Sequence, residues 1–296
     1  MNASTPATIM DSITSTFQQH RPRLMGVAYR MLGSRADAED VLQDAWLRWQ
    51  QADAERVHTA EAWLVTTVTR LCVDRLRAVR HEREHYSGPW LPEPWIVEAT
   101  APPADARAEL ASDLSMALLV VLERLSPDER AAFLLHDVFD SDYSEVAAVL
   151  DRSQAACRQL VHRARTQVRK NQVRFTPTPD AASALLHRFV NAMRAQDHVA
   201  MLSLFAQDAT WTPDGGGKVP AATKVLRGPR ALSRLALAVW RLHLQHLTAC
   251  EVQINGAPGL LLREGSVPRL ALALQTDETH IHGIYTVLNP DKLRGL

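Results

Sequence analysis

The basic residues between Asp151 and Arg174 are those whose type and spacing most clearly suggest a chemical task. This stretch holds one acid, Asp151, and a series of basic residues: Arg152, Arg158, Arg163, Arg165, Arg169, Lys170 and Arg174. The whole chain has 33 basic and 33 acidic residues, so it is not a general binder of polyanions. A local basic stripe in a neutral chain indicates contact with nucleic-acid phosphates.

The elements that must position this stripe are predicted to form a helix-turn-helix between Asp142 and Lys170. Residues 142–150 have the pattern of a short helix, residues 151–153 that of a tight turn, and the next helix has small apolar residues on one face. Long donors on its opposite face can reach base edges and phosphates in a DNA groove. The expected DNA contacts are Ser153, Gln154, Arg158, Gln159, His162, Arg163 and Arg165. A basic helical hairpin with a solvated face has the same spacing, so the pattern alone leaves that alternative open.

Two predicted helices nearer the N-terminus carry opposite charges. The first follows the N-cap Ser34. Its solvent face presents Asp37, Asp40, Gln43 and Asp44. Such a face either complements the helix macrodipole or docks a basic protein partner. The second helix starts after Thr59 and carries Trp63, Arg70, Arg75, Arg77 and Arg80. Aromatic and basic side chains together are typical of surfaces that capture single-stranded nucleic acid, although Trp63 fits a core position equally well.

Prolines interrupt the helical pattern between residues 81 and 103. The stretch contains Pro89, Pro92, Pro94, Pro102 and Pro103, which cannot lie in helix interiors. Its aromatic residues, Tyr86, Trp90 and Trp95, indicate a linker that is docked on another part of the molecule. Rings that simply cover a neighbouring core are the alternative.

Helices resume beyond the linker, and the pattern changes again after Pro179. Ser126 and Asp142 each begin a capping box, which predicts a helix start. The C-terminal part is predicted to contain helices at 180–196 and 198–205, followed by strands around 210–211, 250–254, 259–263, 270–274 and 280–287. Helices followed by strands favour a small α+β domain.

The C-terminal part has candidate acid–base residues without catalytic spacing. They are His187, Asp208, His243, His280 and His282. Because they are scattered over predicted helices and strands, we predict structural roles, no catalytic residues and no enzyme activity. The glycine-rich run Asp214–Lys218 lacks the frame of a nucleotide-binding loop, and its glycines favour a loop that lets a partner approach closely.

Cysteine usage and hydropathy limit the classes of protein further. Cys72, Cys157 and Cys250 lie far apart and form no Cys-x-x-Cys pair, so we predict no disulfide framework, no metal site and a reducing compartment. The N-terminus lacks a signal-peptide pattern, and no apolar run approaches the roughly 18 residues of a membrane helix. We therefore expect a cytoplasmic protein without a membrane partner and without a cofactor.

Longer stretches resemble regions 2 and 4 of extracytoplasmic-function (ECF) sigma factors, a group within the sigma-70 family. Those similar to region 2 are Ala28–Ser34, Asp37–Arg48, Ala62–Leu64 and Asp74–Arg77. Those similar to region 4 are Leu125–Phe133 and Tyr143–Ala147. The match departs at Arg70, where many members carry Asn. Three loop-type segments, Tyr86–Pro94, Asp214–Lys218 and Asn289–Leu293, resemble the subfamily with a fused SnoaL-like (NTF2-like) domain.

The resemblance implies a multidomain protein. Two all-α sigma domains, a region 2 helical bundle and a region 4 helix-turn-helix, are followed by a C-terminal α+β SnoaL-like cone. The expected boundaries are 12–83 for region 2, 84–108 for the Pro/Trp-rich linker, 109–174 for region 4 and 180–296 for the regulatory SnoaL-like domain.

The resemblance also implies a function in transcription initiation. The chain would bind core RNA polymerase, on the clamp of the largest subunit, and direct it to promoter DNA. The implied polymerase contacts are Asp37, Asp40, Gln43 and Asp44. The implied contacts to the promoter −10 element are His58, Trp63, Arg70, Arg75 and Arg77. The −35 element would be read by the helix-turn-helix residues from Ser153 to Arg165 named above.

The three loop-type segments motivate a hypothesis of intramolecular regulation, in which the SnoaL-like domain holds the linker and sets the spacing of regions 2 and 4. The residues expected at this contact are Tyr86, Trp90, Pro92, Trp95, Asp214, Gly215, Gly216, Gly217, Lys218, Asn289, Pro290, Asp291 and Lys292. We expect no separate anti-sigma protein, and we consider a small apolar ligand in the C-terminal cavity. The alternatives are a ligand-responsive DNA-binding regulator and a SnoaL-type enzyme with a DNA-binding appendage.

Overall fold

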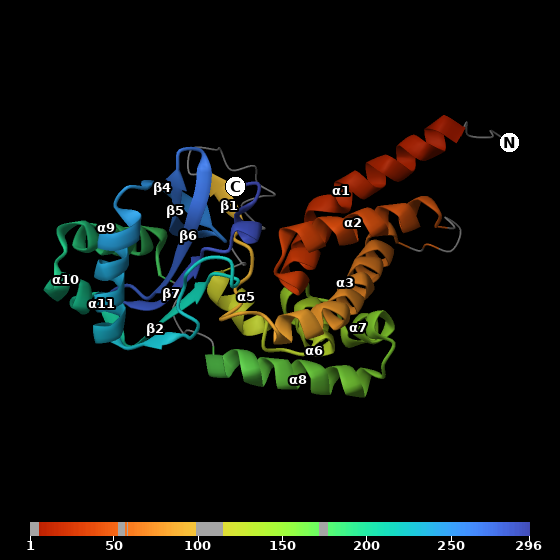
Figure 1. Ribbon diagram of the computed structural model, residues 1–296. Helices are drawn as coiled ribbons and strands as arrows, with labels where there is room; N and C mark the ends of the chain where they lie inside the picture. Colours follow the sequence, from red (N-terminus) through yellow and green to blue (C-terminus); the bar gives the residue numbers. More distant parts are fainter. Residues whose placement is uncertain (1–5, 53–56, 58, 99–114, 172–176) are drawn as a thin grey trace. The chain divides into compact units, whose positions relative to one another are not determined.

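The computed structural model describes residues 6–52, 57, 59–98, 115–171 and 177–296 (Figure 1). Contacts between residues divide the chain into two compact units. The first combines Met1–His81 with Val121–Asn171, and the second combines Glu82–Val120 with Gln172–Leu296. None of the described helices is long and apolar enough to cross a membrane.

The first unit is helical. It contains α1 (Pro6–Leu32), α2 (Arg35–Gln50), most of α3 (Ala60–Glu84), α6 (Pro127–Phe133) with a π-helical turn at Leu134–Val138, α7 (Tyr143–Leu150) and α8 (Gln154–Asn171). The boundary between the two units falls within α3, after His81. Its fully buried side chains include Tyr29, Met31, Leu64 and Leu134. Because these residues come from α1, α3 and the turn after α6, both helical parts of the sequence contribute to this unit.

Side-chain caps start three of these helices, as predicted. Ser34 accepts a hydrogen bond from the backbone N–H of Asp37. Ser126 and Asp142 each form a complete capping box with the Glu three residues later, Glu129 and Glu145. The caps satisfy N–H groups that have no partner inside the helix, each contributing about 1 kcal/mol.

The predicted helix-turn-helix is formed by α7 and α8. Asp151 ends α7 in the left-handed conformation, with φ of 53°, and so makes the tight turn. The buried face of α8 consists of Cys157, Leu160, Val161, Ala164 and Val168. The apolar pattern predicts Ala156, Leu160, Ala164 and Val168 on this face. Ala156 is only half-buried, whereas Cys157 and Val161 are buried, so the exposed face of α8 is rotated slightly from the expected one.

A seven-stranded mixed sheet forms the second unit. Its strands are β1 (Ile96–Glu98), β2 (Phe205–Asp214), β3 (Leu226–Arg227), β4 (Thr248–Ile254), β5 (Ala257–Glu264), β6 (Val267–Thr276) and β7 (Ile281–Val287). They lie in the order β1-β4-β5-β6-β7-β2-β3, with β2 parallel to β7 and all other pairs antiparallel. The predicted α+β class of this part is confirmed.

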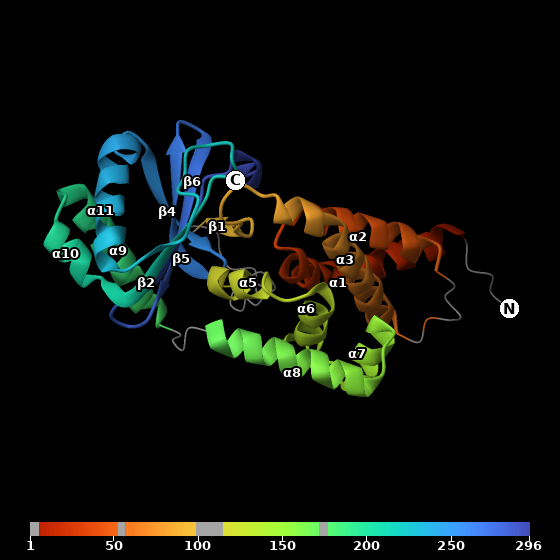
Figure 2. The same ribbon diagram turned by 60° about the horizontal axis from the view of Figure 1, so that its bottom comes forward.

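Helices cover one face of the sheet. α9 (Pro179–Ala195), α10 (His198–Ser203) and α11 (Pro229–Val239) lie on the same side of the strands in both views (Figures 1 and 2). Their core includes Phe189 and Leu232 packed against Leu260 and Ile284 of the sheet. The patterns above assigned no element to α11, although Gly228-Pro229 is a regular helix start.

The linker contributes to the second hydrophobic core of this unit. Leu91 and Met116, the first residue of α5 (Met116–Leu122), pack with Val252, Leu261 and Tyr285 of the strands. Ile96 packs against the same cluster, and Ile96–Glu98 pair with Ile254–Val252 as an added antiparallel strand. The Pro/Trp-rich segment is therefore a structural part of the sheet unit.

Candidate nucleic-acid interface and linker site

The DNA-reading candidates form an exposed row on α8. Gln154, Arg158, Gln159 and His162 are exposed to solvent. Ser153, which is also exposed, accepts a hydrogen bond from the backbone N–H of Ala156 and so caps this helix. The guanidinium of Arg158 lies 5.2 Å from the centre of the Tyr143 ring, in a cation–π contact.

Two further arginines of α8, Arg163 and Arg165, are paired with acids of the same unit. Arg163 Nε donates to Glu129 at 2.7 Å. Arg165 donates to both carboxylate oxygens of Asp137 at 2.7 Å, and this pairing raises the pKa of the guanidinium. Arg165 is half-buried, so it fixes α8 to the turn after α6 as well as lying beside the expected DNA face. The sequence patterns did not indicate these acidic partners.

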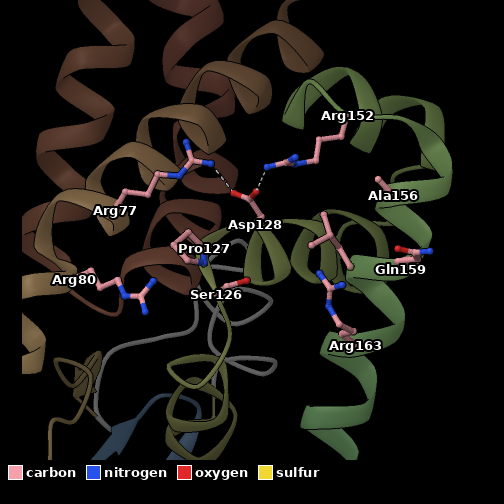
Figure 3. Close-up of a pocket in the computed structure, with 10 residues that line it drawn as sticks. Arg77, Arg80, Ser126, Pro127, Asp128, Arg152, Ala156, Gln159 and Arg163 are labelled. Carbon is pink, nitrogen blue, oxygen red and sulfur yellow. Dashed lines mark hydrogen bonds and ion pairs between the residues drawn. The ribbon is translucent and has the colours of Figure 1, made fainter.

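The arginines expected at the −10 element also have partners within the unit. Arg70 donates to the carbonyl oxygens of Val149 and Ala148 at 2.9 and 2.7 Å. Arg77 donates to Asp128 at 2.7 Å. Arg70 therefore connects α3 to α7, the first helix of the helix-turn-helix, and Arg77 connects α3 to α6 (Figure 3).

Two of the remaining −10 candidates, Arg75 and Trp63, contact other residues of region 2. Arg75 donates to Asp37 at 2.9 and 2.6 Å, which links α3 to α2. The half-buried Trp63 ring packs against that of Trp49, with centroids 5.3 Å apart. His58 lies outside the described residues.

Arg130 forms a second link that the sequence patterns missed. It is 2% exposed and donates to the carbonyl oxygen of Met31 at 2.5 Å and to Glu123 at 2.6 Å. A buried guanidinium with these two acceptors joins α6 to the end of α1. Its only sequence signal was a charged residue on the inner face of a short capped helix.

In the second unit, Asp214 is the centre of the contact between the linker and the sheet. It is fully buried at the end of β2. Its carboxylate accepts hydrogen bonds from the Tyr86 hydroxyl at 2.6 Å, the Leu91 backbone N–H at 2.8 Å and the Lys292 ammonium at 2.7 Å. Two of these donors belong to the linker, and the third belongs to the C-terminal 3-10 turn (η4, Pro290–Leu293).

Lys292 completes this contact from the other side. Its ammonium also donates to the Leu91 carbonyl and lies 4.0 Å from the centre of the Trp90 ring and 4.9 Å from that of Tyr86. Burial lowers the pKa of Lys292 to about 8, although the neighbouring Asp214 opposes the shift. Burial and the hydrogen bond to Asp214 raise the pKa of the Tyr86 hydroxyl.

The glycine loop gives the linker room to approach. Gly216 has φ of 61°, and a Cβ there would lie 2.9 Å from the Tyr86 hydroxyl oxygen and closer still to the Asn289 side chain. Gly217 has φ of 70°, and a Cβ there would lie 2.9 Å from Cβ of Ser87. Both the backbone conformation and the available space therefore require glycine. The Asn289 amide itself donates to the Tyr86 hydroxyl at 2.9 Å.

The other expected contact residues surround this centre. Pro92 is buried. The backbone N–H of Trp95 donates to the Asn255 side chain at 3.2 Å, and the Asn255 N–H donates back to the Trp95 carbonyl at 2.8 Å. Lys218 pairs with Asp291 on the surface. Asn255 was not among the predicted residues; its positive φ of 52° places it in the turn after β4.

Comparison with known proteins identifies the family. Residues 16–82 match the family model of sigma-70 region 2, and residues 115–168 match that of sigma-70 region 4. The chain is 38% identical to the ECF RNA polymerase sigma factor SigJ of Mycobacterium tuberculosis, over 95% of this chain and 93% of that protein. The chain belongs to the ECF sigma factors. Their function is in transcription initiation, in which core RNA polymerase and promoter DNA are the partners.

Further similarities extend over the whole of this sigma factor. It is 28% identical to the probable ECF sigma factor SigI of M. tuberculosis, over 96% of this chain and 95% of that protein. The crystal structure of SigJ superposes with a TM-score of 0.77 at 36% identity, covering 94% of this chain and 97% of that one. The helical parts are sigma regions 2 and 4, and the C-terminal sheet domain has the SnoaL-like fold.

The expected polymerase-binding residues of this sigma factor lie on α2. Asp40, Gln43 and Asp44 are exposed and point away from the buried face formed by Ala38, Val41, Leu42 and Ala45. Asp37 differs, because it is half-buried and accepts from Arg75. The exposed acidic surface is therefore formed by the later turns of α2.

The structure brings two acid–base candidates of the SnoaL-like domain together, His282 and Asp208. His282 lies 2.8 Å from Asp277 and 3.8 Å from Asp208, and His187 lies 2.8 Å from Glu251 on the surface. Among the described residues, none of these histidines lines the apolar cavity between the helices and the sheet, which is bounded by residues such as Trp211, Trp240 and Leu262. The cavity volume is about 20 Å³, which leaves space for roughly one water molecule. A small apolar ligand would need these helices to move.

Lys292 predicts a pH dependence of the linker contact. Its folded pKa, about 8, lies below the ordinary value of 10.5, so between these two values the unfolded chain holds a proton that the folded chain has released. The free energy of unfolding should therefore rise as pH increases from about 8 towards 10.5. The raised pKa of Tyr86 acts in the opposite sense above pH 10, because there the unfolded tyrosine loses its proton first.

Urea unfolding of the wild type and of Lys292→Met between pH 7.5 and 9.5 measures this effect. This pH range lies below the one in which the Tyr86 hydroxyl loses its proton. The free energy of unfolding should rise with pH in the wild type. It should rise less steeply in Lys292→Met, because methionine takes up no proton on unfolding. Equal slopes in the two proteins would contradict the prediction.

Proposed function

We propose that this sigma factor contacts core RNA polymerase through the exposed acidic surface of α2, reads the −35 element with α8 and contacts the −10 element with α3. The observation that carries the proposal is the exposed row of Gln154, Arg158, Gln159 and His162 on the second helix of a helix-turn-helix. Side chains of this length and type at the N-terminal half of a recognition helix can reach base edges. Arg163 and Arg165 would then serve mainly as phosphate contacts.

The proposal includes a rearrangement within the first unit. Arg70 and Arg77 of α3 are bound to Val149, Ala148 and Asp128 of region 4, so they are not available to DNA in this arrangement. Promoter contacts at two separate elements would need region 4 to leave α3 and those arginines to exchange protein acceptors for phosphates. Polymerase binding would supply the free energy for this exchange.

We further propose that the SnoaL-like domain tunes initiation by holding the linker. The support is the set of hydrogen bonds at Asp214 and the strand pairing of Ile96–Glu98 with β4. A fully extended chain spans at most about 3.5 Å per residue, so residues 86–98 could span up to roughly 45 Å if released, whereas docking on the sheet holds this segment at one fixed span. Docking of the linker would therefore limit how far region 4 can move from region 2.

The remaining expectations follow from this role. The protein would act in the cytoplasm, where polymerase and promoter DNA are present, and would have no catalytic activity of its own. The fused domain would take the place of a separate anti-sigma protein. These statements stay predictions.

In vitro transcription tests both proposals. Core RNA polymerase would be combined with the full chain, with a chain ending at Pro177 and with a chain ending at Asn289, and transcripts would be mapped on genomic DNA. We expect transcripts that start at a common promoter motif with the full chain and a changed output with both shortened chains. If none of the three chains gives specific transcripts, the sigma-factor assignment of these surfaces is contradicted. If all three give equal output, regulation by the SnoaL-like domain is contradicted.

A further inference from the structure

The contacts described above do not use a basic surface of the SnoaL-like domain. This surface consists of α11, the π-helical turn that continues it (η3, Trp240–Leu244) and the segment just before it. Residues 215–250 contain no aspartate or glutamate. The basic residues of this stretch from position 224 onward are all exposed to solvent: Lys224, Arg227, Arg230, Arg234 and Arg241, with His243 and His246.

Acids of the neighbouring elements do not neutralise this surface. No ion pair joins its lysine or its four arginines to a carboxylate in the part of the chain that the structure describes. The elements α10 and β2 pack against α11. Asp197 caps α10, and Asp208 of β2 lies 3.8 Å from His282. Asp214, at the end of β2, is buried in the linker contact. The surface therefore keeps its positive charge.

Three of the arginines form a row along the solvent side of α11 and η3. Arg230 and Arg234 are four residues apart, so they share one face of the helix, and Arg241 follows seven residues later. The opposite face packs on the sheet through Leu232 and Ala236. At 1.5 Å per residue the row extends roughly 16 Å, which equals about five base pairs of duplex DNA at 3.4 Å each.

Helix stability does not explain these arginines. Arg230 lies in the first turn of α11, where the helix dipole favours acidic side chains. Arg230 and Arg234 also repel each other, because like charges four residues apart destabilise a helix. The preceding helix α9 shows the opposite pattern, with Asp180 in its first turn. A polyanionic partner would supply the counter-charges that the fold does not.

We propose that this surface binds the phosphate backbone of duplex DNA without reading its sequence, and so gives the sigma factor a DNA contact outside regions 2 and 4. Guanidinium groups hold phosphate oxygens with two parallel hydrogen bonds, and each neutralised phosphate releases counterions. Such contacts set the position and orientation of a protein on the duplex. Base-specific contacts would remain with region 4.

An anionic membrane is the other polyanion that a basic amphipathic helix can bind. Membrane binding needs an apolar face that is free to enter the boundary between headgroups and acyl chains. The apolar face of α11 is already buried against the sheet. Leu242, which is 63% exposed, is alone among the side chains that the structure describes on α11 and η3 in being large, apolar and exposed. Phosphate contacts need only exposed charge, so the surface fits DNA better.

Fluorescence anisotropy of a labelled random duplex, titrated with the full chain between about 50 and 200 mM salt, tests the proposal. Arg230→Gln/Arg234→Gln should weaken duplex binding by at least about tenfold at low salt. It should also reduce the slope of log affinity against log salt by about 1.8, since each lost phosphate contact removes roughly 0.9. Arg230→Lys/Arg234→Lys keeps both charges and should keep the slope. The helix α8 is unchanged in these variants, so the test does not depend on the proposed reading of the −35 element.

The control variant Arg269→Gln/Arg294→Gln makes the same change in net charge on other elements of the same unit. These side chains are 53% and 80% exposed and are paired with Glu264 and Asp291. The control should bind the duplex like the wild type. Equal duplex affinity in the α11 variant and in this control would overturn the proposal. Vesicles that contain phosphatidylglycerol provide the membrane arm. If the α11 variant loses binding to these vesicles and keeps duplex binding, the surface is a membrane site and the proposal is wrong.

Discussion

Replacement of Asp214 by alanine is expected to release the linker from the SnoaL-like domain and to destabilise that unit by about 3–5 kcal/mol. The carboxylate is fully buried and accepts hydrogen bonds from Tyr86, Leu91 and Lys292. Its removal leaves the Lys292 ammonium buried beside two aromatic rings without the carboxylate that it binds. A buried charge that loses its partner costs far more than the pair contributes when it is complete.

Urea unfolding gives the stability change, and hydrogen exchange at the Leu91 amide reports on linker docking. The matched control is Asp277→Ala, which removes another well-bonded carboxylate of the same unit, one that accepts from Thr279, His280 and His282. The control should lower stability while leaving the Leu91 amide protected. If that amide exchanges equally slowly in Asp214→Ala and in the wild type, then Asp214 does not hold the linker.

The parts of the fold that could be predicted from the sequence are those decided by local interactions. The caps at Ser34, Ser126 and Asp142 involve donors two or three residues away, so their patterns are contained in a few positions. The strand β1 is different, because Ile96 pairs with Ile254 on a strand that is distant in the sequence. A short apolar run after several prolines gives no sign of that partner, and only the aromatic content of the linker indicated docking.

The sequence did not predict the ion pairs at the candidate nucleic-acid interface, because the acidic residues in them have a second, local role. Glu129 was already accounted for as the closing residue of a capping box, yet its second oxygen accepts from Arg163. Asp128 favours the first turn of α6, and it also bridges Arg77 and Arg152. The residue types of Glu129 and Asp128 are already explained by their positions at the start of a helix. The sequence therefore gives no further sign that each also binds an arginine far along the chain.

Charge reversal of the acidic surface on α2 tests the polymerase contact most directly. Asp40→Lys/Asp44→Lys should lower the affinity for core RNA polymerase by at least about 100-fold, because placing like charges opposite each other in an interface costs several kcal/mol and each 1.4 kcal/mol is about tenfold. Both side chains are exposed, on the face opposite Ala38, Val41 and Ala45, so folding of the first unit should be unaffected. Fluorescence anisotropy of labelled sigma factor titrated with core polymerase measures the change.

The control for this experiment has the same change in net charge on the SnoaL-like domain. Asp208→Lys/Glu264→Lys reverses two carboxylates whose side chains are 90% and 55% exposed. If polymerase affinity falls equally in both double variants, the effect is one of overall charge and α2 is not the docking surface. Loss confined to the α2 variant, at unchanged thermal stability, locates the contact at Asp40 and Asp44. Asp37→Asn should then have a smaller effect on affinity and a larger one on stability, since that carboxylate is bound to Arg75 within region 2.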